Sequence, residues 1–277
     1  MRIFDAHCDT LSAGRPLRRN SGGFDVERAV RRGGGVQVMA AFGEGQEAQL
    51  LRLAREREAL APSLADSGVL ALVPALEGAD TVRDLDGARR FLALGVRCFG
   101  LTWNHDNALG GGCLGGGMGL TDTGRDVIAL CESHRVAVDL AHSSETLFWD
   151  ALECSMRPPV VTHACMAALR PHPRNLSDAQ LRALGRRGGV AGVAFHVPFL
   201  TGEASCSLER VAEHICHAVN MAGEDAVGIG SDFDGSGALP AGLEETGALP
   251  ALIERLPLPD RVREKVAYCN FARVLVY

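Results

Sequence analysis

Histidine and carboxylate side chains stand close together near the start of the chain, where one residue separates His7 from Asp9. They follow Ile3 and Phe4, which predict a short buried strand. Because side chains two apart on a strand point the same way, His7 and Asp9 would leave the strand end side by side. Such a pair can hold a divalent metal, although an isolated pair is also typical of a polar turn.

Further candidate ligands follow apolar segments of strand length later in the chain. Each stands where its segment ends, and they are Glu77, His142, His163 and Asp232. In a parallel barrel the carboxyl ends of all strands meet at one face, which is where the chemistry of such barrels takes place. Three histidines and three carboxylates at one face are enough ligands for two metals, with one carboxylate to spare. The set therefore predicts a metal site.

The composition is that of an ordinary folded protein, with 277 residues, 47% hydrophobic and 22% charged. A net charge of −6 gives no basic surface for nucleic acid. No apolar run approaches the roughly 18–20 residues that cross a bilayer. We expect a soluble, cytoplasmic protein with neither a nucleic-acid nor a membrane partner.

Lysine and cysteine usage narrows the chemistry further. Lys265 is the single lysine, so no lysine in the body of the chain can form a Schiff base or bridge two metals. A bridge between two metals would have to be Glu or Asp. The nine cysteines have no C-x-x-C spacing and predict free thiols, with Cys8 and Cys165 as weak candidates for metal contact.

Apolar strand-length segments alternate with segments of helical period along the chain. Strands are expected at residues 2–4, 36–42, 69–76, 96–101, 137–140, 160–162, 189–194 and 227–229. Helices are expected at 25–32, 46–66, 85–94, 121–134, from about 144 to 153, 177–187 and 207–222, with further helices at 248–256 and 260–276. Eight strand–helix units predict a single (β/α)8 TIM-type barrel domain over residues 1–277, with extra C-terminal helices. A doubly wound open sheet is the alternative.

The glycine-rich segment 110–119 follows the fourth predicted strand. It lacks the Gly-Lys-Ser/Thr ending of a phosphate-binding loop. We therefore interpret it as a mobile lid or rim loop.

Several short motifs together resemble the membrane (renal) dipeptidase family of zinc peptidases, in its short bacterial form. They are DAHCD at 5–9, ALEG at 75–78, LT at 101–102, GLTDTG at 119–124, DLAHS at 139–143, TH at 162–163, RN at 174–175, GGV at 188–190 and VGIGSDFDG at 227–235. The motifs recur in the order of the family, so the resemblance covers nearly the whole chain.

The resemblance implies the barrel fold and a site with two Zn²⁺ ions. His7 and Asp9 would bind the first zinc, His142 and His163 the second, and Glu77 would bridge both. Paired metals share a water and lower its pKa, so that hydroxide forms near neutral pH. They also polarise the scissile carbonyl.

Asp232, the spare carboxylate, would take the proton from that water and pass it to the departing amine. A carboxylate that caps the following turn is the alternative role for Asp232. Asp234 is expected to stabilise the same loop.

Substrate contacts are implied at the rim of the site. Arg174 resembles the family arginine that faces the substrate, where a guanidinium can clamp a free carboxylate; the alternative is a surface arginine paired with Asp178. Many family members carry a histidine where this chain has Trp103, and tryptophan cannot become a cation. Either His105 reaches in from two residues along, or the substrate binds differently.

The remaining histidines have plainer interpretations. His214 and His217 stand three apart on one predicted helix, where such a pair can bind metal but usually meets solvent. His172 and His196 lie on loops near the predicted mouth of the barrel and are candidates to line it.

The expected function is a binuclear zinc dipeptidase that hydrolyses small dipeptides by attack of a metal-bridging hydroxide. The resemblance also implies tolerance of a C-terminal D-residue. The alternatives are another metal-dependent amide or ester hydrolase on the same barrel, and a catalytically silent binding protein. The family often forms dimers, and the sequence leaves a homodimer open.

Overall fold

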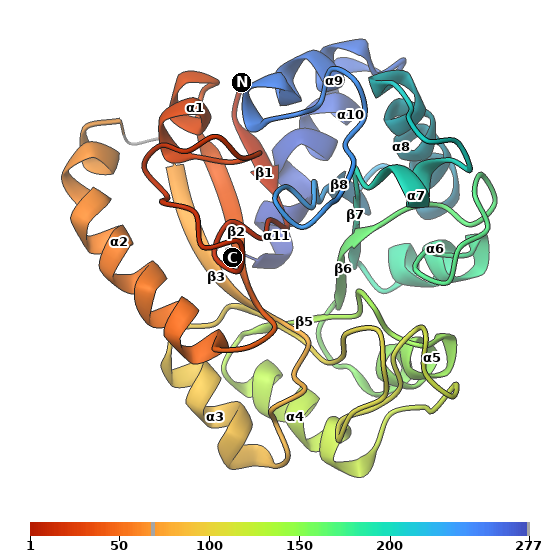
Figure 1. Ribbon diagram of the computed structural model, residues 1–277. Helices are drawn as coiled ribbons and strands as arrows, with labels where there is room; N and C mark the ends of the chain where they lie inside the picture. The colour runs from red at the N-terminus through yellow and green to blue at the C-terminus, as the bar shows by residue number, and fades with distance from the viewer. Residues whose placement is uncertain (68–69, 276–277) are drawn as a thin grey trace.

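Eight parallel strands form a closed barrel in which each strand pairs with its neighbours in sequence order, and β8 pairs with β1 (Figure 1). The computed structural model describes the backbone of residues 1–67 and 70–275. The strands are β1 (Ile3–Asp5), β2 (Gly35–Phe42), β3 (Leu70–Glu77), β4 (Cys98–Gly100), β5 (Ala137–Asp139), β6 (Val160–Ala164), β7 (Val190–Val193) and β8 (Val227–Ile229). The predicted TIM-type barrel is confirmed, while the expected strand start at Val69 lies outside the described residues.

Helices surround the strands and alternate with them along the chain (Figure 1). They are α1 (Val26–Arg31), α2 (Gln46–Ser67), α3 (Leu85–Ala93), α4 (Asp122–Ser133), α5 (Glu145–Cys154), α6 (Asp178–Arg186), α7 (Val197–Leu200) and α8 (Leu208–Ala222). The short helix α7 was not expected from the sequence. No helix in the part of the chain that the structure describes is long and apolar enough to cross a membrane.

The polar residues that precede several helices explain where those helices begin. Each accepts a hydrogen bond from a backbone N–H of the first turn, and the residues are Asp25, Asp84, Thr121, Ser144 and Ser177. Ser177 and Gln180 complete a capping box, which satisfies two backbone donors that a helix end otherwise leaves unpaired. Ser177 is thus the N-cap of α6.

The C-terminal helices differ from the single helix expected at 260–276. After α9 (Leu249–Arg255), the chain forms α10 (Asp260–Glu264), a π-helical stretch (Lys265–Cys269) and α11 (Asn270–Leu275). The wider π turn accompanies a change in helix register, and Val266, Ala267 and Phe271 are all buried. Phe271 stacks on Phe4 of β1 with 5.7 Å between ring centroids. The expected end of this helix at Val276 lies outside the described residues.

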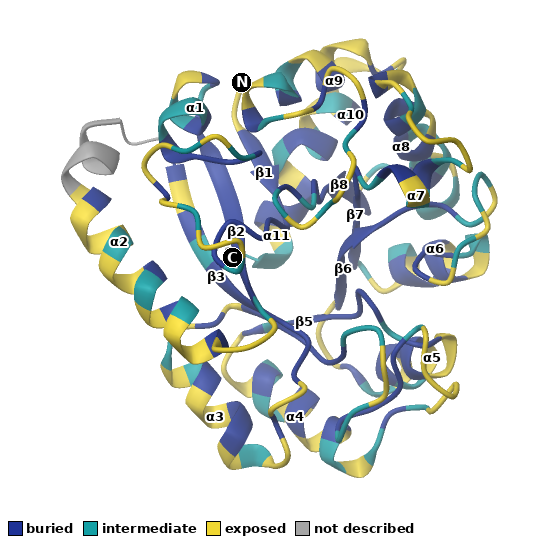
Figure 2. Cartoon of the chain, in the orientation of Figure 1, coloured by how far each residue is buried: buried dark blue, intermediate teal, exposed yellow. Residues whose placement is uncertain are grey.

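Burial divides each element into an inner and an outer side. The strands are almost entirely buried, and the surrounding helices alternate between buried and exposed residues (Figure 2). Gly192 on β7 and Gly230 after β8 lie against the carbonyl oxygen of Thr162 on β6, where a Cβ atom would overlap with it. These close approaches hold the end of the barrel where the candidate ligands stand.

The glycine-rich segment 110–119 lies on the rim of the barrel. Its backbone is tied to the loop after β5, because Cys113 N donates to His142 O at 2.8 Å and Ser144 N donates to Gly111 O at 2.8 Å. The Asp106 carboxylate accepts from Gly112 N and Gly116 N. The segment therefore packs beside His142 as a rim loop.

Candidate metal centre and substrate cavity

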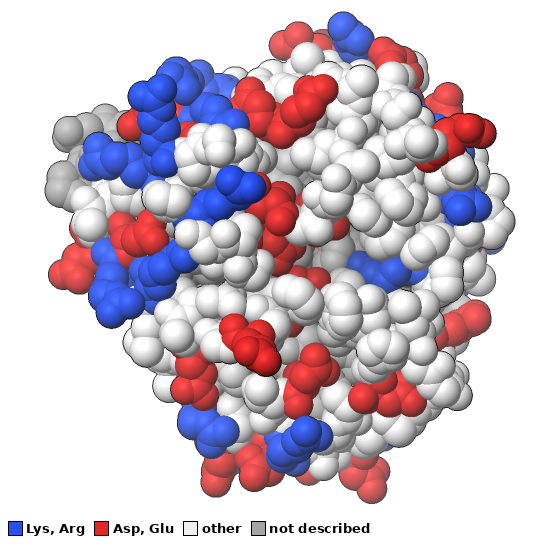
Figure 3. Space-filling model, in the orientation of Figure 1, with Lys and Arg blue, Asp and Glu red and all other residues white. Residues whose placement is uncertain are grey.

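A cavity of about 650 Å³ opens at the carboxyl ends of the strands. Figure 3 shows a hollow near the middle of this face, with acidic side chains along its border and a basic group beside it. The cavity is lined by Asp9, Ser12, Ala13, Phe42, Gly43, Glu44, Gln49, Glu77, Trp103, Asn104, Leu114, His142, His163, His172, Arg174, His196, Phe199, Asp232, Asp234 and Gly235.

The barrel brings all six predicted histidines and carboxylates together, and all of them except His7 line the cavity. They come from the ends of five different strands: His7 and Asp9 after β1, Glu77 at the end of β3, His142 after β5, His163 on β6 and Asp232 after β8. Five of the six are buried, and the Asp232 side chain is 13% exposed. Residues far apart in the sequence meet here because parallel strands in a barrel share one carboxyl-terminal face.

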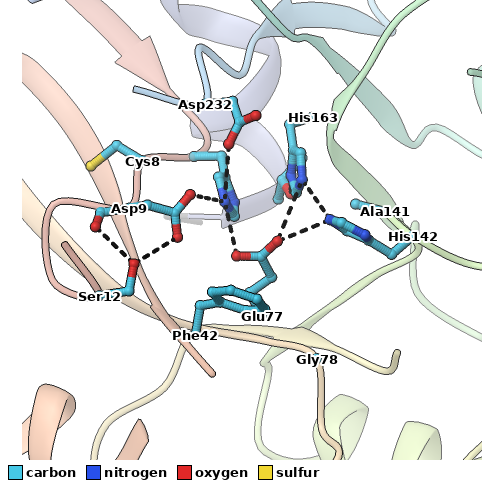
Figure 4. Close-up of polar contacts among 12 residues, drawn as sticks. Cys8, Asp9, Ser12, Phe42, Glu77, Gly78, Ala141, His142, His163 and Asp232 are labelled. Atoms are coloured by element: carbon cyan, nitrogen blue, oxygen red, sulfur yellow. Dashed lines mark hydrogen bonds and ion pairs between the residues drawn. The ribbon is translucent and has the colours of Figure 1, made fainter. Parts of the chain in front are cut away.

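Glu77 lies at the centre of the cluster, with its two oxygens facing different groups (Figure 4). Its Oε2 is 3.3 Å from His7 Nε2, which in turn is 3.3 Å from Asp9 Oδ2. Its Oε1 is 2.9 Å from His142 Nε2 and 3.7 Å from His163 Nε2. The carboxylate thus stands between two sets of potential metal ligands.

The donor atoms of this cluster fit divalent cations. Ligand atoms of His7, Asp9 and Glu77 lie within 4.8 Å of one another, and so do those of Glu77, His142 and His163. Within the described residues, His7 Nε2 and Glu77 Oε2 are buried without a hydrogen-bond partner. Buried polar atoms are normally paired, so a cluster of such atoms with imidazole and carboxylate chemistry suits metal binding.

The pKa values of the histidines shift in opposite directions on the two sides of Glu77. Burial, reinforced by the Arg174 charge, lowers the pKa of His142 to about 3. Burial and nearby positive charge also hold the pKa of His163 well below its usual range. Burial opposes protonation of His7 too, but the carboxylates of Glu77 and Asp9 raise its pKa well above the ordinary value. His142 and His163 are therefore neutral, and a metal at His7 has to displace a proton.

Asp232 stands above the cluster in a constrained conformation. Its φ is 63°, in the left-handed region that few non-glycine residues adopt, and His142 has a φ of 65°. Asp232 Oδ2 accepts from Ser236 Oγ at 3.0 Å, and Oδ1 is 4.0 Å from His7 Nε2. Burial and the negative charge of Asp9 raise the pKa of Asp232 to about 8. A carboxyl group with a pKa near neutrality suits proton transfer.

Arg174 lies on the cavity wall, buried beside the histidines. Its Nη2 donates to His163 O at 3.2 Å, and its Nε has no hydrogen-bond partner among the described residues. Asp178, the alternative partner, instead contacts His217 at 2.7 Å and Arg182 at 3.8 Å. The surface pairing of Arg174 with Asp178 is therefore wrong, and the guanidinium is available to a ligand.

Trp103 and His105 occupy different positions. Trp103 lines the cavity between two rings, with its centroid 5.1 Å from that of Phe42 and 5.9 Å from that of His142. His105 is exposed, lies outside the cavity lining, and its ring is 6.4 Å from that of Trp103. The structure thus places an indole beside the candidate metal ligands and His105 away from them.

Some cavity residues had no signal strong enough to select them from the sequence. Phe42 and Phe199 are ordinary apolar residues in the sequence. The rings of His172 and His196, which were expected near the mouth, line the cavity and contact Phe199 in a tilted and an edge-on arrangement, with centroids 4.6 and 4.5 Å away. Asn104 is closest to the ligands, with Oδ1 2.8 Å from His142 Nδ1. Its place just after the fourth predicted strand is the signal that could have identified it.

The other polar residues considered in the sequence have structural contacts. His214 is buried, which corrects the expectation of a solvent-facing histidine. Its Nδ1 accepts from Met166 N, and its Nε2 donates to Leu200 O. Asp234 accepts from Thr10 and from Gly23 N, as expected for a residue that stabilises its loop.

The two cysteines beside the ligands also have other contacts. Cys8 Sγ is 3.6 Å from Met39 Sδ, and Cys165 Sγ donates to Ala194 O at 3.3 Å. Neither belongs to a candidate metal-binding group among the described residues.

A closed (β/α)8 barrel with such a buried histidine–carboxylate cluster at its carboxyl end is typical of metal-dependent hydrolases. The model of the membrane dipeptidase family, peptidase family M19, matches residues 36–276. The chain belongs to this family of metallopeptidases. The matched region begins after His7 and Asp9.

Curated relatives are similar in sequence over much of the chain. An uncharacterized protein in the pqqA 5′ region of Klebsiella pneumoniae is 39% identical over 225 residues, which are 75% of this chain and 82% of that protein. An uncharacterized dipeptidase of Schizosaccharomyces pombe is 35% identical over 196 residues, covering 68% of this chain. The matched part is 47% of the S. pombe protein, so the chain spans less than half of that relative.

Solved structures share the whole fold. A metallopeptidase from Rhodobacter sphaeroides, liganded with a phosphinate mimic of the dipeptide L-Ala-D-Ala, matches with a TM-score of 0.86 and 25% identity over 100% of this chain and 99% of that one. Dipeptidase AC, a metallopeptidase of family M19, matches with a TM-score of 0.86 and 26% identity over 99% of this chain and 98% of that one.

Proposed function

We propose that this chain is a binuclear zinc dipeptidase that hydrolyses the peptide bond of small dipeptides. The observation that carries the proposal is the position of Glu77, whose two oxygens face His7 and Asp9 on one side and His142 and His163 on the other. Those residues would hold two divalent metals with Glu77 as the bridge. Zn²⁺ suits the mixed imidazole and carboxylate donor set.

Arg174 would select the substrate by its C-terminal carboxylate. Within the described residues, its buried Nε has no hydrogen-bond partner, so it could donate to a substrate. A guanidinium binds a carboxylate through parallel hydrogen bonds. A cavity of about 650 Å³ suits a short peptide more than a folded protein. The L-Ala-D-Ala mimic bound to the R. sphaeroides enzyme supports a dipeptide substrate, and extends the proposal to those with a C-terminal D-residue.

The protein residues have separate tasks in the reaction. Metals bound at the cluster would lower the pKa of a water and polarise the scissile carbonyl. Asp232 would accept a proton from the attacking water and deliver it to the departing amine, which its pKa of about 8 allows near neutral pH. Arg174 would orient the dipeptide, and Trp103 and Phe42 would form an apolar wall beside it.

A dipeptide panel tests the proposal. Purified protein is assayed on L-L and L-D dipeptides before and after treatment with a chelator, and again after zinc is restored. We expect cleavage that is lost on chelation and recovered with zinc. Protein that carries two metals per chain and cleaves no dipeptide in the panel would contradict the dipeptidase assignment.

One observation favours a second candidate, a metal-dependent hydrolase of another amide or ester. Trp103 stands on the cavity wall 5.9 Å from the His142 ring, where many family members carry a histidine. An indole offers one hydrogen-bond donor and no positive charge, so the wall would favour a less polar substrate. Hydrolysis of N-acyl amino acids or aryl esters in place of dipeptides would support this candidate.

A further inference from the structure

His142 and His163 are both held from behind, at the ring nitrogen that faces away from the metal cluster. His142 Nδ1 is 2.8 Å from Asn104 Oδ1, and His163 Nδ1 is 3.0 Å from Thr162 Oγ1. The Nε2 atoms of the two rings point the other way, 2.9 Å apart and toward Glu77. Each ring therefore uses one nitrogen for a protein contact and turns the other toward the cluster.

The partners of Thr162 determine which nitrogen of His163 carries the proton. The Thr162 hydroxyl donates to Asp139 Oδ2 at 2.5 Å, since a carboxylate can only accept. Asp139 is buried and its other oxygen accepts from Ala141 N at 3.0 Å and Thr162 N at 2.9 Å, so it is fixed in place. With its own hydrogen given to Asp139, Thr162 Oγ1 can only accept from His163. His163 must then carry its proton on Nδ1.

Asn104 likewise determines which ring nitrogen of His142 carries the proton. Its Oδ1, which also accepts from Cys113 Sγ at 3.4 Å, is an amide oxygen and can only accept. His142 Nδ1 must therefore donate, and its Nε2 keeps a lone pair. Two Nε2 lone pairs that face each other at 2.9 Å repel unless a cation lies beside them.

We propose that Asn104 and Thr162 are positioning residues that fix His142 and His163 in the tautomer that leaves Nε2 free for the metal, with Asp139 orienting the Thr162 hydroxyl. This inference rests on the proposed function, because it assigns these residues to the second metal. Outer contacts of this kind typically change metal affinity by about 10- to 100-fold.

Matched substitutions separate this role from simple packing. Thr162→Val removes the hydroxyl while keeping the shape, and Thr162→Ser keeps the hydroxyl. Asn104→Leu removes the acceptor, and Asn104→Asp keeps it. The zinc dissociation constants of the two sites are measured by competition with a chromophoric chelator. The histidine tautomers are measured by nuclear magnetic resonance of protein labelled with ¹⁵N-histidine.

We expect Thr162→Val and Asn104→Leu to weaken one of the two zinc sites about 10- to 100-fold and to leave the other unchanged. Thr162→Ser and Asn104→Asp should stay close to wild type. The ring signal of His163 should show a proton on Nδ1 in wild type and lose that preference in Thr162→Val.

Three results would overturn the inference. Equal losses in Thr162→Val and Thr162→Ser would show that packing, not the hydroxyl, matters. Unchanged affinity and tautomer in the folded Val and Leu variants would show that neither residue positions a ligand. A wild-type protein that binds no zinc would also overturn the proposed function, whereas normal wild-type binding with unaffected variants would overturn this inference alone.

Discussion

At the scale of single residues, environment gives chemically similar side chains different tasks. Glu77 and Asp232 are both carboxylates in one cavity, yet their pKa values move in opposite directions. Burial opposes ionisation of Glu77, but the neighbouring His7 and His142 hold its pKa well below the usual range. Burial and the negative charge of Asp9 raise the pKa of Asp232 to about 8, and the contact with His7 at 4.0 Å does not offset them. Glu77 is therefore suited to ligate and Asp232 to exchange a proton.

Substitution of Asp232 by Asn tests its role in proton transfer. The amide keeps the shape and the contact with Ser236 but cannot accept a proton from water. We expect Asp232→Asn to lower kcat about 10²- to 10⁴-fold, with little change in KM for the dipeptide. Metal content is measured on the same sample. A variant that loses its metals together with its activity would instead make Asp232 a ligand.

Substitution of Arg174 by Met tests recognition of the carboxylate. Hydrogen bonds to charged groups contribute about 1.5–3 kcal/mol, so we expect kcat/KM for a dipeptide to fall about 10- to 100-fold. A dipeptide with an amidated C-terminus is the control, because it lacks the charge that Arg174 would bind. Wild type should discriminate between the two substrates and Arg174→Met should not. Equal discrimination by both proteins would rule out this contact.

The raised pKa values predict how the stability of the metal-free protein depends on pH. Above pH 7, unfolded His7 and Asp232 have lost their protons, because their ordinary values are 6.5 and 3.8. In the folded state both pKa values are raised, so the folded state binds more protons between pH 7 and 9. Stability should therefore fall as pH rises through this range, by up to about 1.4 kcal/mol per pH unit for each proton.

Thermal melts at pH 7, 8 and 9, with and without zinc, check this expectation. Zinc replaces the protons at the cluster, so the increase in Tm on adding zinc should grow with pH. A metal-free Tm that rises steadily from pH 7 to 9 would mean that His7 and Asp232 do not hold these protons.

At the scale of elements, buried carboxylates join neighbouring strands just below the ligands. Asp5 at the end of β1 accepts from Ser231 N at 2.8 Å and Ser231 Oγ at 2.6 Å, which ties β1 to β8 next to Asp232. Asp139 at the end of β5 makes the matching contacts with Thr162 on β6, next to His163. Pairs of strands are thus fixed at the level from which the ligands project.

Glycines at the same level allow the strand ends to approach one another. An alanine Cβ at position 230 would overlap with the carbonyl oxygen of Thr162, which is backbone and cannot move aside. We expect Gly230→Ala to destabilise the protein by more than about 3 kcal/mol, measured by urea unfolding. Gly237→Ala is the control, since a Cβ there meets no atom within 4 Å. Equal stability of the two variants would contradict the close packing described here.

At the scale of the whole molecule, much of the fold could be predicted because it depends on alternation. Apolar strand segments and helical periods repeat eight times, which predicts the barrel. The candidate ligands stand where predicted strands end, which predicts the face of the barrel that carries the site. The irregular parts did not follow. The π-helical stretch Lys265–Cys269 has no sequence pattern that distinguishes it from an α-helix, and it depends on packing against β1 and β8.

Contacts between loops that are distant in the sequence could not be predicted either. The burial of His214 depends on Met166 and Leu200, and the contact of Asn104 with His142 spans 38 residues. The distance of His105 from the cavity depends on how the rim folds. The assignment of residues 1–277 to a single domain and the homodimer stay predictions, and so do the roles of the individual site residues.

The most direct test of the account is a crystal structure of the protein grown with zinc, with anomalous diffraction recorded on both sides of the zinc absorption edge. The account predicts two zinc peaks in each chain. One should lie among His7, Asp9 and Glu77, and the other among Glu77, His142 and His163. A single peak, or zinc bound away from Glu77, would contradict the binuclear site on which the proposed function depends.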